Sequence, residues 1–290
     1  VLPFQKGTNQ FLMPFDGEER HFSVYVPSSY NESKATPVVF GFHGTSGNGN
    51  SFMTKSKWID KAEQEGIIIV FPTAWKYFII HENRTTTKWN ETHLIHLVNP
   101  GTKVMDDVGL VKAIFTSLIE TFNINKRSVY ATGFSNGGRF VNTRVVPELN
   151  SIFAAVATSS GMAREDHNVQ GSLLPNYTIV GTKDGKLMER THSSLPIEID
   201  AWAQDSILNL LYVGMTQTLK TGTSYQQKIT NNKRVYTYQF GDHKSSSPQQ
   251  GFWMISIIDQ MRHVYPNGTN NPYQFVAANR FWRFFEQFER

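Results

Sequence analysis

The feature that most constrains the fold is a series of short apolar runs separated by segments with helical periodicity. The runs do not strictly alternate apolar and polar residues, which predicts strands buried on both faces of a parallel sheet. They cover residues 37–42, 67–71, 128–132, 153–158, 177–180 and 252–258. Helical spacing is found at residues 51–65, 107–122, 136–146 and 271–289. Because strand and helix alternate, we predict an α/β fold with a mainly parallel central sheet and helices on both faces.

Two segments depart from this alternation. Within the N-terminal region of residues 1–30, residues 10–27 predict a hairpin that turns at Asp16-Gly17. Residues 186–250 contain one helix-like piece near 199–211 and then a polar stretch, and we interpret them as an insertion over the C-terminal edge of the sheet. This insertion is either a lid or a surface excursion. No linker or repeat divides the chain, so we expect a single domain over residues 1–290.

Composition excludes several classes of protein. The net charge is +4 and the basic residues are scattered, so we expect no nucleic-acid partner. The absence of cysteine excludes disulfides, cysteine-based zinc sites and a thiol nucleophile. No stretch is long and apolar enough to cross a bilayer. The chain begins at Val1 rather than Met, which we interpret as a processed or trimmed N-terminus. We expect a secreted or periplasmic protein.

The strongest motif is Gly133-Phe134-Ser135-Asn136-Gly137, which fits the pattern G-x-S-x-G and is followed by another glycine. An apolar strand-like run leads into it and a helical pattern leads out, which is the context of a nucleophile elbow. Glycines two residues either side of the serine let the two arms of such a tight turn approach each other. The pattern alone is common, but this context predicts Ser135 to be a catalytic nucleophile.

A serine hydroxyl needs a base, and the base needs an orienting carboxylate. In this fold these residues follow in the order serine, acid, histidine. Asp184 lies in a Gly-rich turn directly after the strand-like run 177–180, and functional residues of open α/β sheets lie at the carboxyl ends of strands. Glu165, Asp166 and Glu189 are less well placed. We therefore predict Asp184 to be the acid; the alternative is an ordinary turn aspartate beside a glycine.

Three histidines follow the predicted acid and compete for the role of base. His192 is too close in sequence to Asp184 to come from a later strand. His243 follows the strand-like run 234–240 and remains a competitor. His263 follows the stronger run 252–258 and precedes the last helix by a short loop, where the base is expected. Strand placement therefore favours His263 over His243.

An oxyanion hole needs two backbone N–H donors. Asn136, directly after the nucleophile, would supply one of them. The loop after the strand-like run 37–42 begins His43-Gly44-Thr45, and we expect the Thr45 N–H to be the second donor. His43 precedes Ser135 in the chain, against the order rule, so we expect it to be structural.

Six segments occur together in an order typical of one family. They are Phe-His-Gly-Thr at 42–45, Trp-Asn at 89–90, Asp-Asp-Val-Gly at 106–109, the ten residues 129–138, Gly-Thr-Lys-Asp at 181–184 and His-Val-Tyr-Pro-Asn-Gly at 263–268. In these segments the chain resembles the polyhydroxybutyrate-depolymerase-like esterases, and it is similar to the feruloyl and acetylxylan esterases of carbohydrate esterase family one. The resemblance covers roughly residues 20–288. It implies an α/β-hydrolase fold and ester hydrolysis with no metal and no organic cofactor.

The resemblance also bears on individual residues. It supports Ser135, Asp184 and His263 as the triad. The segment that begins at His263 is similar to the family's catalytic histidine segment, although Tyr265 stands where the family usually has Trp, and this similarity decides against His243. Departures from the family are the absence of cysteine and the segment 186–250, which matches no family pattern.

Two further positions are candidates for substrate binding, and one acidic pair is not. Gly44 is expected to contact the substrate. Trp89 resembles a family position near the substrate cleft, although it fits a buried core position nearly as well. Asp106 and Asp107 are expected to cap a helix rather than to catalyse.

The sequence therefore predicts a serine esterase. Its expected partner is an ester substrate, either small or polymeric. Three substrate classes compete: hydroxycinnamoyl or acetyl esters of polysaccharide, hydroxyalkanoate polyesters, and aromatic polyesters. An aromatic content of 13% slightly favours the first and the third. Alternatives are a non-catalytic carbohydrate- or polymer-binding protein on the same scaffold, and a peptidase or acyltransferase. The sequence does not determine the oligomeric state.

Overall fold

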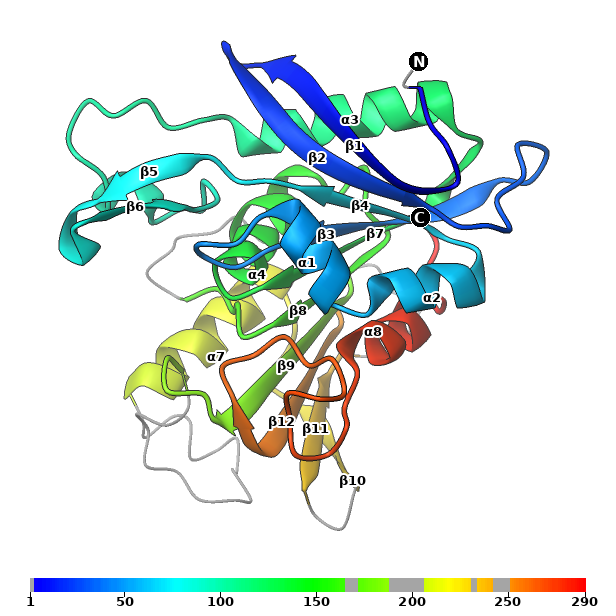
Figure 1. The fold of residues 1–290 in the computed structure, drawn as a ribbon. Helices are drawn as coiled ribbons and strands as arrows, with labels where there is room; N and C mark the ends of the chain where they lie inside the picture. Colours follow the sequence, from blue (N-terminus) through cyan, green and yellow to red (C-terminus); the bar gives the residue numbers. More distant parts are fainter. Residues whose placement is uncertain (1–2, 165–171, 188–205, 231–233, 242–250) are drawn as a thin grey trace.

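A computed structural model describes residues 3–164, 172–187, 206–230, 234–241 and 251–290 (Figure 1). Within these residues ten strands form one sheet, in the order β1-β2-β4-β3-β7-β8-β9-β12-β11-β10. Their bounds are β1 Gly7–Phe15, β2 Glu18–Val26, β3 Thr36–Phe42, β4 Ile68–Pro72, β7 Ile124–Phe134, β8 Ala155–Ser159, β9 Asn176–Lys183, β10 Tyr225–Thr230, β11 Val235–Phe240 and β12 Trp253–Arg262. The strands from β4 to β12 in this order are parallel, and antiparallel strands flank them on both sides. The predicted α/β class with a parallel sheet centre is confirmed.

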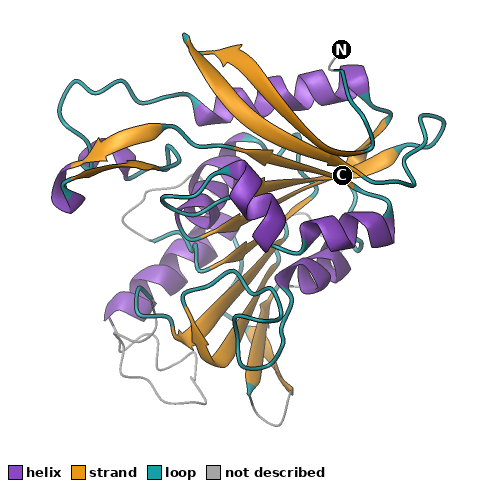
Figure 2. Ribbon diagram, in the orientation of Figure 1, coloured by secondary structure: helices purple, strands orange, loops and turns teal. Residues whose placement is uncertain are grey.

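Helices cover both faces of this sheet, as Figure 2 shows. One apolar core lies under α3 (Asp107–Thr121), the helical segment that starts with α4 (Asn136–Phe140), and α7 (Ser206–Leu219). The opposite core lies under α1 (Gly49–Lys55), α2 (Trp58–Glu65) and α8 (Ala277–Phe285). Successive residues of β3 point to opposite cores, Val38 and Phe40 to the first and Val39 to the second. None of the described helices is long and apolar enough to cross a bilayer.

Three predicted helices differ from the observed ones. The helix expected over 51–65 is divided into α1 and α2, because Lys57 adopts a left-handed conformation with φ 66°. The helix expected over 271–289 is α8 alone, since the Asn271 side chain both accepts from and donates to the backbone of Phe275. Such a side chain offers the backbone an alternative to helical hydrogen bonds. The helix over 136–146 is interrupted by a π-helical turn at Val141–Val145.

The described residues 206–230 and 234–240 belong to the central sheet and to one of its helix layers, so the predicted insertion is wrong for these residues. α7 contributes Leu211, Met215 and Leu219 to the first core, and β11 pairs with β12 along its length. β10 pairs in turn with β11 and ends the sheet. The polar composition of β10 concealed it, because an edge strand with mostly exposed side chains needs no apolar pattern. The prediction that part of 186–250 is a lid concerns residues 188–205 and 242–250. These lie outside the described residues.

At the other end of the sheet, the predicted N-terminal hairpin is formed by β1 and β2, which pair about Asp16 and Gly17. Arg20 of β2 is buried and donates to the buried carboxylate of Asp107 at 2.6 Å. Burial raises the pKa of Asp107 although Arg20 opposes this shift. Asp106 caps α3 by accepting from the Gly109 N–H, as expected. The hairpin is thus attached to α3 by a buried ion pair.

A small sheet of two strands, β5 (Lys76–Ile79) and β6 (Arg84–Thr87), lies apart from the large one and has its own apolar cluster. Short helical turns, η1 (Ile80–Glu82) and η2 (Leu94–His96), accompany it. These strands were not predicted from the sequence, because each has only four residues.

Candidate active site

The structure forms the predicted elbow between β7 and α4. Ser135 has φ 53° and ψ −117°, a conformation that L-residues rarely adopt and that is held by its surroundings. Its N–H donates to the Ser159 carbonyl, and its carbonyl accepts from the Arg139 N–H. A Cβ on Gly133 would lie 2.6 Å from the carbonyl oxygen of Gly137, so this turn requires glycine there.

Three side chains from three separate strand ends meet at this turn. Ser135 follows β7, Asp184 follows β9 and His263 follows β12. Ser135 Oγ lies 2.9 Å from His263 Nε2, and His263 Nδ1 lies 2.8 Å from Asp184 Oδ2. Asp184 is fully buried, whereas the His263 side chain is 19% exposed. This geometry is that of a nucleophile, a base and an orienting carboxylate joined by a chain of hydrogen bonds.

Opposing effects act on the carboxylate. Burial raises the pKa of Asp184, but its hydrogen bonds and the charge of His263 together outweigh burial, with His263 contributing most, so that this pKa lies below its ordinary value. The Lys186 N–H also donates to Asp184 Oδ1, at 3.0 Å. Asp184 is therefore ionised at neutral pH, and an ionised carboxylate accepts from His263 Nδ1–H and leaves Nε2 free to accept a proton.

A bulge brings His263 to this position. β12 and β9 pair in parallel to Ile258 and Gly181, and their register then shifts before Arg262 pairs with Lys183. Gly181 permits the close approach, because a Cβ there would lie 2.0 Å from the Met261 carbonyl oxygen. Bulges often re-aim a side chain beside a functional site. The extra residues extend β12 so that His263 reaches the serine.

Residues that the sequence analysis did not single out hold the histidine loop. The Ser159 hydroxyl donates to the Val264 carbonyl at 3.0 Å. The buried Tyr265 hydroxyl accepts from Trp58 Nε1 at 2.8 Å and lies 3.0 Å from Thr132 Oγ1. The ring of Phe134 lies 5.0 Å from that of His263. The position of Phe134 inside the elbow motif was a usable signal, and Ser159 could have been found as the residue that ends β8 at the same sheet edge.

The loop after β3 is fixed by a buried histidine. His43 Nδ1 donates to the Gly44 carbonyl at 2.7 Å, and His43 Nε2 accepts from the Ala74 N–H at 3.0 Å. Burial lowers the pKa of His43 to about 4, so the ring is neutral at physiological pH. A neutral imidazole suits this pair of contacts, because one nitrogen donates and the other accepts. His43 is structural, as the sequence analysis expected.

The two expected oxyanion donors are available for a ligand. Within the described part of the chain, the backbone N–H groups of Thr45 and Asn136 donate to no acceptor. Thr45 lines a pocket that also includes His263, and Asn136 begins the helix directly after Ser135. A helix N-terminus favours negative charge. The Asn136 side chain has another task, since its Oδ1 accepts from the Trp89 N–H at 2.8 Å.

The two candidate substrate-binding positions differ. Gly44 lines the pocket, and a Cβ there would lie 3.3 Å from the Ser135 Cβ, which places it beside the serine. Trp89 is 0% exposed, with its ring stacked on Phe140 and its Nε1 donating to the His43 carbonyl. The substrate-contact role expected for Trp89 is therefore wrong, because a fully buried indole reaches no ligand. Trp89 instead holds the loop that carries Gly44 and Thr45, through its hydrogen bond to the His43 carbonyl.

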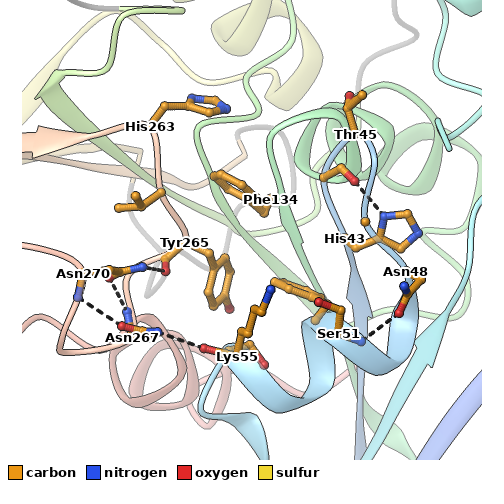
Figure 3. A pocket seen from close by; sticks show the side chains of 15 residues that line it. His43, Thr45, Asn48, Ser51, Lys55, Phe134, His263, Tyr265, Asn267 and Asn270 are labelled. Carbon is orange, nitrogen blue, oxygen red and sulfur yellow. Dashed lines mark hydrogen bonds between the residues drawn. The ribbon is translucent and has the colours of Figure 1, made fainter. Parts of the chain in front are cut away.

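The pocket beside these residues has a volume of about 330 Å³ (Figure 3). Phe52, Phe134 and Tyr265 form apolar walls, and the 44–48 loop forms one side. Among the described residues, no cluster of three or more histidine and carboxylate side chains is arranged to hold a metal ion. The competing candidates from the sequence, His192, His243, Glu165, Asp166 and Glu189, lie outside the described residues.

Comparison with known proteins gives the same family as the sequence motifs. A family model described as "Putative esterase" matches residues 15–163. The chain is 27% identical over 171 residues to the bifunctional acetylxylan esterase/xylanase XynS20E of Neocallimastix patriciarum, covering 59% of this chain and 22% of the relative. It is 28% identical over 125 residues to a probable feruloyl esterase C of Aspergillus flavus, covering 41% of this chain and 38% of that protein. The resemblance to acetylxylan and feruloyl esterases is thereby confirmed.

A solved structure extends the similarity over the whole fold. The acetyl xylan esterase from Aspergillus awamori superposes with a TM-score of 0.62 at 12% identity, over 96% of this chain and 99% of that one. At this identity the match shows the fold, which is the predicted α/β-hydrolase type. The chain spans only 22% and 38% of the lengths of the two sequence relatives named above.

Proposed function

Because the chain belongs to this esterase family, we propose that it is a serine carboxylic-ester hydrolase that acts on acetyl or hydroxycinnamoyl esters of polysaccharide. The observation that carries the proposal is the continuous chain of hydrogen bonds from Ser135 through His263 to Asp184. Ser135 Oγ lies 2.9 Å from His263 Nε2, and His263 Nδ1 lies 2.8 Å from Asp184 Oδ2. The names of the relatives, acetylxylan esterase and feruloyl esterase, support the substrate class.

The proposed reaction transfers the acyl group in two steps. His263 Nε2 removes the hydroxyl proton as Ser135 Oγ attacks the ester carbonyl, and Asp184 stabilises the imidazolium. The oxyanion accepts from the N–H groups of Thr45 and Asn136. The protonated His263 then donates to the leaving alcohol. Water, activated by the same histidine, hydrolyses the acyl-enzyme and restores the serine.

The serine is the point at which this proposal is tested. We expect Ser135→Ala to lower kcat/KM on a chromogenic short-chain ester by at least about 10³-fold, with an unchanged unfolding midpoint, because it removes the nucleophile only. Near-normal activity of this variant would exclude the mechanism. Failure of the wild-type protein to react with a serine-directed phosphonate would instead favour a non-catalytic binding protein.

A second measurement addresses the substrate class. Methyl ferulate, acetylated xylan and a hydroxybutyrate oligomer are compared at equal ester concentration. We expect hydrolysis of one or both of the first two to exceed hydrolysis of the third. The opposite order would replace the polysaccharide esters with polyesters, and the triad proposal would stand unchanged.

The proposal extends to domain organisation and location. We propose that residues 1–290 form one catalytic domain, since strands from the two ends of the chain, β1 and β12, belong to one sheet. Limited proteolysis that released two stable pieces would contradict this. We also propose a secreted or periplasmic location, because a polymeric ester is too large to enter a cell. Fractionation of the source cells tests this location.

A further inference from the structure

The pocket beside the proposed triad has an unusual distribution of polar groups. Of its described lining residues, Lys55 is the only lysine, arginine or carboxylate. Lys55 is exposed and ends α1, and its ammonium makes no ion pair with a described residue. Figure 3 shows its side chain rising from α1 into the pocket, with His263 beyond Phe134 at the other end of the view.

The amide side chains of the same pocket are already used. The Asn267 carbonyl oxygen accepts from Thr269 and from the Asn270 N–H, and its amide nitrogen donates to the Lys55 carbonyl. The Asn270 amide nitrogen donates to the Tyr265 carbonyl. The Asn48 side chain caps α1. These amides hold the pocket's shape, so the Lys55 ammonium is the strongest polar group left to meet a ligand.

The same contacts fix Lys55 relative to the triad. Asn267 belongs to the loop that begins at His263, and its bond to the Lys55 carbonyl joins this loop to the end of α1 at 3.2 Å. The charge is therefore carried on backbone that is hydrogen-bonded to the loop of the proposed base. The Lys55 ammonium therefore exerts its charge on whichever part of the ester, acyl or alcohol, enters the pocket.

We propose that this pocket receives a part of the ester that bears a carboxylate, and that Lys55 is the residue that selects it. The proposal rests on the proposed esterase function and names its substrate more closely. The carboxylate has two sources: an acyl group derived from a dicarboxylic acid, or an acidic sugar on the alcohol side. An ammonium and a carboxylate attract by their charges in either case, and the absence of other charges in the described lining leaves this attraction uncompensated.

A lysine in the last helical turn also interacts favourably with the helix dipole. That role would affect the stability of α1 and would treat charged and neutral esters alike. A dependence on the charge of the substrate therefore separates selection from helix stabilisation.

The test uses two pairs of esters that differ only in charge. The acyl pair is the 4-nitrophenyl monoester of glutaric acid and 4-nitrophenyl pentanoate. The alcohol pair is an acetylated methyl glucuronoside and the matching acetylated methyl glucoside. Each is assayed with the wild type, Lys55→Met, Lys55→Glu and the control Lys57→Met. Lys57 is a close match because it is exposed, pairs with Asp60 and does not line the pocket.

We expect kcat/KM of the wild type to favour the charged member of one pair by about five- to tenfold, the size of one charge pair in a partly hydrated site. Lys55→Met should abolish this preference, Lys55→Glu should reverse it, and Lys57→Met should retain it. Salt at 1 M should reduce it as well, since exposed charges are screened. The pair that responds identifies the source of the carboxylate.

Equal effects of Lys55→Met on charged and neutral members of both pairs would overturn the proposal. Hydrolysis of the neutral members tests the esterase function independently of Lys55. Binding of glutarate and glucuronate to Ser135→Ala, with and without Lys55→Met, measures the same interaction without turnover. Equal affinity with and without Lys55 would also contradict the selection.

Discussion

The buried His43, which holds the loop after β3, allows a quantitative prediction of how stability changes in acid. His43 is 1% exposed, and burial lowers its pKa from 6.5 to about 4. In the unfolded chain the same residue returns to its ordinary value. Between these two pKa values the unfolded state binds a proton that the folded state does not, so stability rises with pH across this window and falls on acidification.

The magnitude follows from the two pKa values. Linkage gives a loss of about 2 kcal/mol from this residue between pH 7 and pH 5, and about 3 kcal/mol by pH 4. The physical reason is that a charged ring would lose the acceptor nitrogen that the Ala74 N–H requires, and its charge would be buried.

Urea unfolding of the wild type and of His43→Asn at pH 7, 6 and 5 isolates this contribution from that of other groups. The Asn amide retains a donor toward Gly44 but leaves the Ala74 N–H unpaired, so the variant should be about 1–3 kcal/mol less stable at pH 7. Because Asn does not titrate, the difference between the two proteins should shrink by about 2 kcal/mol at pH 5. A difference that stays constant over this range would refute the reasoning, as would an NMR titration that places the His43 pKa near 6.5.

Three further predictions concern the triad, the hairpin and the elbow. Asp184→Asn should lower kcat by about 10⁴-fold in steady-state assays with little change in unfolding midpoint, because the imidazole loses its orienting charge; a loss below tenfold would contradict its role. Arg20→Met should destabilise the protein by about 3–5 kcal/mol in urea at pH 7, because it removes the cation that pairs with the buried Asp107 carboxylate. The loss should be smaller at acid pH, since burial already raises the pKa of Asp107; an equal loss at both pH values would show that packing dominates. Gly137→Ala should lower kcat by about 10²-fold, because its Cβ would meet the His43 carbonyl oxygen at 2.3 Å and displace the elbow; a crystal structure with an unmoved elbow would exclude this explanation.

The central strands could be predicted from the sequence because each is buried on both faces. Their apolar runs are continuous, as β3 and β4 illustrate, and only the end residues needed adjustment. The edge strand β10 could not be predicted in this way, since its side chains are mostly exposed. The break between α1 and α2 was missed because Lys57, not glycine or proline, adopts the left-handed conformation there.

The residues of the candidate site also differ in how far the sequence could predict them. The elbow, a local pattern, predicted Ser135, and the order of the partners along the chain led to Asp184. That order left two histidines, and strand placement with the resemblance to the family's histidine segment favoured His263 over His243. The sequence could not decide between a surface and a buried position for Trp89. That choice depends on packing against Phe140 and on the bond to the His43 carbonyl, which join segments distant in the chain.

The sequence by itself thus determined the fold class, the elbow and the three residues proposed for catalysis, since all of these leave local patterns of periodicity, glycine and strand ends. Only the tertiary structure decided how these residues meet. The adjacency of β9 and β12, and the bulge beyond Ile258, bring Asp184 and His263 within hydrogen-bonding distance. The same is true of Lys55, whose charge belongs to the pocket only because α1 lies against the loop of His263, a contact that no local pattern encodes.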